Sequence, residues 1–148
     1  MKKVFIFLLV FLCVVCFMRA QEKTVAEKEA AAVKAAALDY IEGWYEGSSE
    51  RMARALHPAL HKVGVQTYRP GGNVVLSPIG YTAMVELAAM GVGKKVPPEK
   101  RNISVKILDL SKNIASVKTV SLEFIDYVLL AKLDGEWKII NVLWEPAE

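Results

Sequence analysis

The sequence has no cysteine after position 16, because Cys13 and Cys16 are its only two. If the segment before residue 21 is removed, the remaining chain has no disulfide, no thiol nucleophile and no thiolate ligand for a metal ion. Its two histidines, His57 and His61, lie on either side of Pro58 and do not share a helical face. No third ligand is near them in the sequence, so we predict no metal site.

An excess of charge of one sign is also missing once the first twenty residues are set aside. The whole chain has 19 basic and 16 acidic residues. Lys2, Lys3 and Arg19 lie in the first segment, so 16 basic residues balance 16 acidic ones in the rest. A neutral chain gives no electrostatic reason to bind a polyanion, and we expect no nucleic acid partner.

The first twenty residues have the pattern of a secretory signal peptide. Two lysines precede an unbroken apolar run from Val4 to Met18, and the small residue Ala20 suits cleavage before Gln21. The run is about five residues too short to span a membrane as a helix. We therefore predict a cleaved signal peptide over residues 1–20 and one secreted or periplasmic domain over residues 21–148, with no membrane association after cleavage. An uncleaved anchor is the alternative.

After residue 25, the spacing of apolar residues first predicts helices. From Ala26 to Tyr45, apolar residues recur at three- and four-residue spacing, which is typical of a long amphipathic helix. The buried stripe of this helix consists of Val33, Ala36, Ala37, Tyr40, Ile41 and Trp44. Gly47 ends the helix, and Ser48 or Ser49 caps a short second helix. Ser77-Pro78 is typical of a helix start, and we predict a third helix with Ser77 as its N-cap and Pro78 as its first residue.

Alternating apolar residues predict strands in the rest of the chain. The segments His61–Tyr68 and Val74–Leu76 flank a turn and form one hairpin. A second hairpin has a three-residue loop at Ser111–Asn113, which places Ile107 opposite Val117. Helices followed by antiparallel strands indicate an α+β fold.

The last hairpin, Phe124–Trp144, is the best-defined element. Asp134-Gly135 predicts a tight type I′ turn, which places Leu130 opposite Ile139 and Asp126 opposite Leu143. Asp126 and Asn141 are then diagonal neighbours on one largely apolar face. The other face is apolar as well, so we expect helices to cover one side and a partner subunit the other.

Three ordered segments resemble the putative lumazine-binding family of the nuclear transport factor 2-like, or SnoaL-like, superfamily. They are DYIEGWYEG (Asp39–Gly47), ERMARALHP (Glu50–Pro58) and FIDYVLLAKLDGEWKIINVLW (Phe124–Trp144). The resemblance implies a cone-shaped domain, with a long N-terminal helix and shorter helices packed on a curved, mainly antiparallel sheet. It also implies a small, often aromatic ligand at the mouth of the cone and a homodimer formed through the sheet. The superfamily includes isomerases, dehydratases and pure binding domains, so the fold does not select a function.

Asp126 and His57 are the catalytic candidates. If Asp126 faces the cavity, burial raises its pKa and makes it a usable general base. His57 then acts as a proton shuttle with Asp126 as its orienting partner. The structural alternatives are that Asp126 bonds Asn141 or a loop backbone, and that His57 caps a helix end.

Ligand binding is the other role that the sequence offers these residues. Tyr40 and Trp44 could stack on a planar aromatic molecule, or simply belong to the core. Together with Asp126, Asn141 and His57 they form the predicted ligand-binding set.

Three functions follow, none of which requires a cofactor. The first is a secreted, non-catalytic domain that binds a small molecule in an apolar cavity. The second is a cofactor-independent isomerase or dehydratase that uses the Asp126 and His57 pair. The third is a protein-interaction module that uses the outer sheet face, with Tyr127, Leu129, Ile140 and Trp144.

Overall fold

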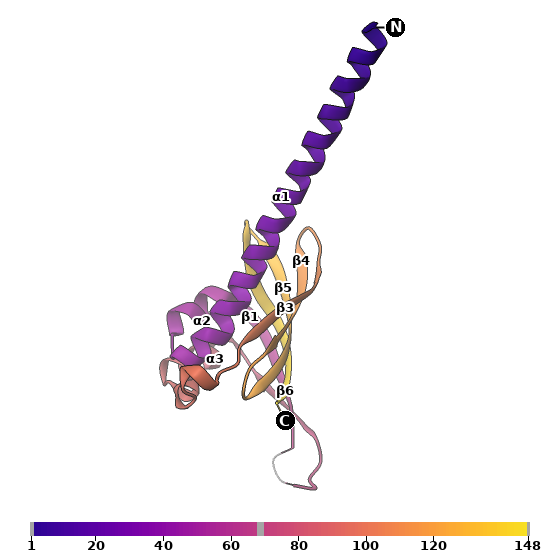
Figure 1. Ribbon diagram of the computed structural model, residues 1–148. Coiled ribbons are helices and arrows are strands. Elements are labelled where there is room, and N and C mark those ends of the chain that lie inside the picture. Colours follow the sequence, from indigo (N-terminus) through magenta and orange to yellow (C-terminus); the bar gives the residue numbers. More distant parts are fainter. Residues whose placement is uncertain (1, 68–69, 148) are drawn as a thin grey trace. The chain divides into compact units, whose positions relative to one another are not determined.

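The computed structural model describes residues 2–67 and 70–147, so Tyr68, the predicted end of the first strand, lies outside the described residues. The chain divides into two units, residues 1–31 and 32–148. Helix α1 (Lys2–Glu46) begins in the first unit and ends in the second (Figure 1). Among the residues whose side chains are described, no helix is long and apolar enough to cross a membrane.

The last turns of α1 and two shorter helices belong to the second unit. Gly47, with a φ of 64°, ends α1, and Ser48 caps α2 (Ser49–Ala55) by accepting a hydrogen bond from the Arg51 amide, as predicted. The predicted stripe of α1 is buried except at its end. There Tyr45 is fully buried, and Trp44, which the spacing had placed in the stripe, is only half-buried.

The third helix begins later than predicted. Ser77 and Pro78 lie in strand β2 (Val75–Ile79), and α3 (Tyr81–Ala89) starts after Gly80. The Ser-Pro pair is compatible with a strand because β2 is at the edge of the sheet, where a missing backbone N–H is tolerated. Two short 3-10 helices, Val92–Lys95 and Pro98–Lys100, follow α3.

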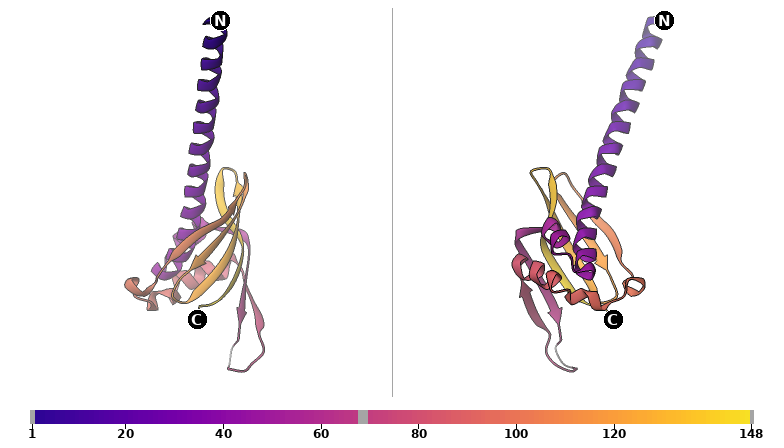
Figure 2. Two further views of the ribbon diagram at one scale, coloured as in Figure 1. Left: turned by 45° about the vertical axis from the view of Figure 1, so that its right-hand side comes forward. Right: turned by 90° about the vertical axis from the view of Figure 1, so that its left-hand side faces the viewer.

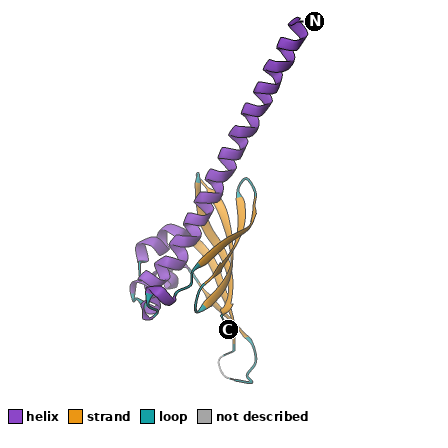
Figure 3. Ribbon diagram, viewed as in Figure 1, coloured by secondary structure: helices purple, strands orange, loops and turns teal. Residues whose placement is uncertain are grey.

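In the described residues, six strands form one mixed sheet in the order β2-β1-β6-β5-β4-β3. Figure 3 shows the strands in orange and the helices in purple. All neighbouring pairs are antiparallel except β1 and β6. The remaining strands are β1 (Leu56–Gln66), β3 (Ser104–Leu110), β4 (Ile114–Val120), β5 (Phe124–Leu133) and β6 (Glu136–Pro146). Figure 2 shows the helices of the second unit on one face of this curved sheet. The predicted α+β architecture is therefore confirmed.

A salt-bridge cluster fastens α2 to α1. The Arg51 guanidinium binds the carboxylates of Asp39, Glu42 and Glu46, and Arg54 also binds Asp39 at 2.7 Å. A Cβ on Gly43 would approach the Arg51 Cβ to 3.1 Å, so a glycine at this position lets the two helices meet closely. The acidic residues of the segment Asp39–Gly47 and the arginines of the segment Glu50–Pro58 therefore hold α1 and α2 together.

The last hairpin keeps its predicted register near the turn and changes beyond it, whereas the β3–β4 hairpin keeps the predicted register from Ile107 away from the turn and is shifted by one residue next to the turn. Ile107 faces Val117, and Leu130 faces Ile139, as predicted. The Asp134-Gly135 turn has the two positive φ angles, 50° and 88°, that a type I′ turn requires.

Beyond Ile139, a β-bulge in β6 shifts the register by one residue. Asp126 therefore lies opposite Trp144, and the predicted pairing with Leu143 is wrong. A one-residue shift moves every later side chain to the other face. Val142 and Trp144 consequently turn toward the helices, and Asn141 faces away from them.

Trp144 packs directly on the neighbouring strand at Gly64, which is its partner in the parallel β1–β6 pair. A Cβ at position 64 would lie 2.7 Å from two carbons of the indole ring. The absence of a side chain at Gly64 is what makes room for Trp144.

We therefore expect Gly64→Ser to lower the free energy of unfolding by about 1 to 3 kcal/mol, the usual effect of overpacking. Urea unfolding monitored by tryptophan fluorescence measures the loss. Gly80→Ser is the matched control, because a Cβ there meets nothing within 4 Å and serine suits the N-cap of α3. Equal stability of the two variants would contradict the packing argument.

Candidate functional site

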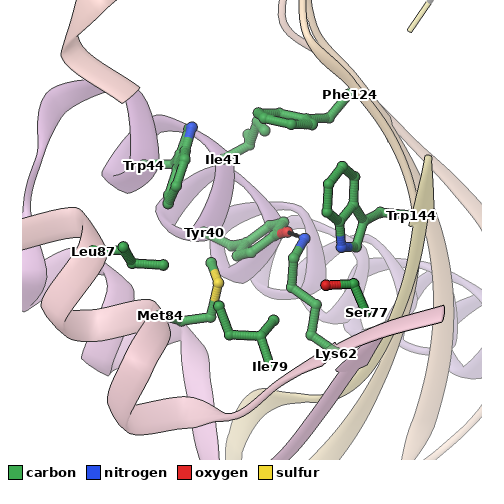
Figure 4. Close-up of a pocket in the computed structure, with 10 residues that line it drawn as sticks. All are labelled: Tyr40, Ile41, Trp44, Lys62, Ser77, Ile79, Met84, Leu87, Phe124 and Trp144. Atoms are coloured by element: carbon green, nitrogen blue, oxygen red, sulfur yellow. Dashed lines mark hydrogen bonds between the residues drawn. The ribbon is translucent and has the colours of Figure 1, made fainter. Parts of the chain in front are cut away.

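A pocket of about 160 Å³, partly open to solvent, lies between the helices and strands β1, β2, β5 and β6. Most of its walls are apolar or aromatic, and Lys62 and Ser77 are the two polar exceptions besides the Tyr40 hydroxyl. The lining residues, drawn in Figure 4, are Tyr40, Ile41, Trp44, Lys62, Ser77, Ile79, Met84, Leu87, Phe124 and Trp144.

Three aromatic side chains form one wall of the pocket. Phe124 contacts Trp144 edge-to-face at a centroid distance of 5.2 Å, and it contacts Trp44 in the same way at 6.1 Å. Such pairs hold one another in place and present flat faces to a ligand. The indole N–H of Trp144 is buried and has no hydrogen-bond partner among the described residues. In Figure 4 it is turned toward Lys62 and Ser77.

The floor of the pocket is a buried polar cluster around Asp126. The Asp126 Oδ1 atom accepts hydrogen bonds from the Tyr40 hydroxyl at 2.8 Å and from the Lys62 Nζ atom at 3.0 Å. The Lys62 ammonium also donates to the Tyr40 oxygen. Thr119 donates to Asp126 Oδ2 at 3.1 Å. Asp126 is completely buried, so these protein donors take the place of water around its carboxylate.

Four elements bring this cluster together. Tyr40 comes from α1, Lys62 from β1, Thr119 from β4 and Asp126 from β5. Thr119 and Asp126 are direct cross-strand partners, and their side chains therefore share a face. Leu60, Lys62 and Gly64 alternate along β1, which turns the Lys62 side chain inward.

Burial dominates the electrostatics of the cluster. It lowers the pKa of Lys62 below the ordinary lysine value, while the Asp126 carboxylate opposes this shift. Burial and the adjacent Asp126 carboxylate together raise the pKa of Tyr40 well above its ordinary value, so the phenol keeps its proton at neutral pH. Lys62 and Asp126 carry opposite charges, and the pocket floor is neutral overall.

The predicted site residues occupy three different places. Tyr40 and Trp44 line the pocket, and Asp126 lies beneath it, bonded to Tyr40. Asn141 is on the other face of the sheet, so the expected pairing with Asp126 is wrong. His57 is at the start of β1, where its Nδ1 accepts a hydrogen bond from the Ala59 amide at 3.1 Å. The described hydrogen bonds of Asp126 do not include His57.

Sequence reasoning missed Lys62, Phe124 and Trp144 as site residues. Lys62 lies in the weakly alternating segment His61–Tyr68, whose pattern does not distinguish the inward-facing residues from the outward-facing ones. Trp144 was assigned to the outer face because the bulge was not foreseen. The spacing of Leu60, Lys62 and Gly64 is the one signal in the sequence for the inward lysine.

The described residues contain no cluster of three or more histidine, cysteine, aspartate or glutamate side chains that could hold a metal ion. The cationic group in the pocket is the Lys62 amine, and the chemistry available there is hydrogen bonding, aromatic stacking and amine chemistry.

A family model described as putative lumazine-binding matches residues 28–145. The fold is similar to that of a nuclear-transport-factor-2-like protein of unknown function from Silicibacter pomeroyi, with a TM-score of 0.61 and 14% identity over 82% of this chain and 98% of that one. A protein of the same description from Shewanella baltica has a TM-score of 0.60 and 17% identity over 82% of this chain and 95% of its own.

A third similar structure is a nuclear-transport-factor-2-like protein with a cystatin-like fold from Novosphingobium aromaticivorans. Its TM-score is 0.61, at 8% identity over 88% of each chain. No curated protein matches the sequence. At these identities the similar structures establish the fold alone.

Removing one member of the buried Lys62–Asp126 ion pair should lower the free energy of unfolding more than removing both members. We expect Lys62→Met to lower the free energy of unfolding by about 3 to 5 kcal/mol, because it leaves a buried carboxylate without its counter-charge. The double variant Lys62→Met, Asp126→Leu should be more stable than the sum of the two single losses predicts. Urea unfolding of the four proteins measures the coupling, and additive losses would show that the pair does not act as a unit.

Proposed function

The chain belongs to the putative lumazine-binding family, and from that premise we propose that its domain binds a small, neutral molecule with a planar apolar body and one hydrogen-bond-accepting end. The observation that carries the proposal is the aromatic pocket above a charge-balanced polar floor. In this proposal the domain binds its ligand without converting it.

The size of the pocket limits the buried part of the ligand. An engineered protein cavity of about 150 Å³ holds one benzene molecule. The present pocket has a similar volume, about 160 Å³, and it is partly open. One aromatic ring therefore fits inside, against Trp44, Phe124 and Trp144, and a second fused ring would extend into the opening.

The polar floor suits a neutral acceptor group such as a carbonyl oxygen. Within the described part of the chain the Trp144 N–H has no hydrogen-bond partner, and a buried donor without a partner costs about 1 to 3 kcal/mol. A ligand carbonyl near Trp144 and Lys62 would remove that cost. An anionic ligand is less suitable, because Asp126 already balances the charge of Lys62 at 3.0 Å.

The contacts of Asp126 favour binding over the alternative of an isomerase or dehydratase. A general base needs a free oxygen that reaches the substrate. Both Asp126 oxygens already accept hydrogen bonds, and the carboxylate has no exposed surface. The proposed partner, His57, is bonded to the Ala59 amide instead.

A second proposal is self-association through the outer face of the sheet. Tyr127, Leu129 and Leu143 are each 48% exposed there, on the adjacent strands β5 and β6. A face that combines several large apolar side chains is typical of a contact surface. A homodimer formed through this face would cover them and leave the pocket on the other face accessible.

We also propose that residues 1–20 act as a signal peptide, with cleavage between Ala20 and Gln21, and that the domain works as a secreted or periplasmic protein. The paired lysines, the apolar run and the small residue at position 20 support this assignment.

Ligand binding is tested with neutral aromatic carbonyl compounds, including lumazine and benzamide, by thermal unfolding and isothermal calorimetry. A ligand at a hundredfold excess over its Kd should stabilise the protein by about 2.7 kcal/mol. Leu87→Trp should abolish this effect by filling the pocket, because Leu87 lines it. The outer-face variant Tyr127→Ala is the control and should bind normally. If Leu87→Trp binds as tightly as the wild type, the ligand lies elsewhere.

Self-association is tested by size-exclusion chromatography with light scattering over a range of concentrations. We expect a dimer for the wild type and a monomer for Leu129→Lys, because a lysine would place a charge in the apolar contact. Leu122→Lys is the matched control, since Leu122 is similarly exposed, at 46%, but lies in the turn before β5. A monomeric wild type at every concentration would reject this proposal.

A further inference from the structure

We infer that the ε-amino group of Lys62 forms a reversible imine with an aldehyde or ketone bound in the pocket. The inference rests on the proposed function, because the carbonyl compound must first bind against the aromatic wall. It adds covalent capture by one named nitrogen atom, and it identifies the ligand class as carbonyl compounds.

The position of Lys62 supplies the first argument. Its side chain lines the pocket, and its Nζ atom lies 4.9 Å from the ring centroid of Trp144 and 5.2 Å from that of Tyr40 (Figure 4). An aromatic ring held against Trp144 would therefore place a carbonyl substituent close to this amine. Lys62 is the lysine among the lining residues, so the reaction would be selective for it.

The surroundings of Lys62 supply the second argument. A lysine becomes a nucleophile when it is held without its proton in an apolar site. Burial lowers the pKa of Lys62, which increases the neutral fraction of the amine.

The neighbouring carboxylate gives that proton a place to go. Asp126 Oδ1 is 3.0 Å from Nζ. Transfer of the proton to Asp126 turns a buried ion pair into a neutral amine and a neutral acid, which removes the desolvation cost of two charges. The acid remains hydrogen-bonded to Tyr40 and Thr119.

The reaction balances without any further reagent. The Lys62 ammonium gives one proton to Asp126, and the neutral amine adds to the carbonyl carbon, forming the C–N bond of a carbinolamine. In the adduct, one N–H proton moves to the former carbonyl oxygen. The Tyr40 hydroxyl, which lines the pocket and is hydrogen-bonded to Asp126 at 2.8 Å, then gives its proton to that oxygen and takes the proton held by Asp126, and the C–O bond breaks as water leaves. The product is a protonated imine whose positive charge lies beside the Asp126 carboxylate. Hydrolysis reverses every step.

The test traps the imine in the wild-type full chain. The protein is treated with benzaldehyde and sodium cyanoborohydride at neutral pH, which fixes each imine as a benzylamine. Peptide mapping by mass spectrometry then compares Lys62 with Lys106, an exposed lysine on β3. We expect Lys62 to be labelled severalfold faster than Lys106, because it lies in the aldehyde-binding pocket and burial lowers its pKa, which enlarges its free-amine fraction. Labelling of Lys62 at or below the rate of Lys106 would overturn the inference.

Two variants show whether the nitrogen of Lys62 is responsible. Lys62→Arg should lose the fast phase of labelling, whereas the matched variant Lys106→Arg should keep it. Circular dichroism establishes whether each variant is folded. The ratio of Lys62 to Lys106 labelling in the wild type decides the question even if Lys62→Arg does not fold.

Benzyl alcohol separates this inference from the proposed function, because it has the same ring as benzaldehyde and no electrophilic carbon. Binding of benzyl alcohol, measured by tryptophan fluorescence, together with slow labelling of Lys62 would leave a binding pocket and remove the imine. Absence of binding and of fast labelling would reject both. Fast labelling that benzyl alcohol competes away would support both.

Discussion

The buried Asp126 carboxylate is the constraint on which the inner side of this domain depends. An ion that has left water needs donors from the protein, since its unpaired burial costs several kcal/mol. Here the donors come from α1, β1 and β4, through Tyr40, Lys62 and Thr119. Four elements, α1, β1, β4 and β5, therefore meet at this one group, and the Tyr40 hydrogen bond joins the last turns of α1 to the sheet.

The same cluster determines which ligands the pocket can accept. Tyr40 and Lys62 both donate hydrogen bonds to Asp126, so the lysine charge is balanced and both donors are engaged before any ligand arrives. The wall above them is aromatic, with Trp44, Phe124 and Trp144 packed edge-to-face. A neutral, planar molecule with one acceptor group is complementary to both parts, and a carbonyl is the acceptor that a buried amine can also attack.

The bulge in β6 links the sheet to this site. Without the extra residue near Ile140, Trp144 would face outward and the pocket would lose part of its aromatic wall. With the bulge, Trp144 lies opposite Asp126 on β5 and beside Gly64 on β1. β-bulges are common next to functional sites because they re-aim a side chain without breaking the sheet. The indole also needs the bare backbone of Gly64, so three strands cooperate to place one side chain.

The sequence by itself determined the elements whose causes are local. The cap at Ser48, the helix end at Gly47, the Asp134-Gly135 turn and the nearby pair of Leu130 and Ile139 all follow from short-range geometry. The α+β class followed from element order, and two pocket residues, Tyr40 and Trp44, followed from helical spacing. Tertiary structure decided the rest, because its causes join distant segments. The bulge lies in β6, which pairs with β1 on one side and with β5 on the other, and only the assembled sheet brings these three strands together. Lys62 is inside because Asp126, 64 positions further along the chain, supplies its counter-charge.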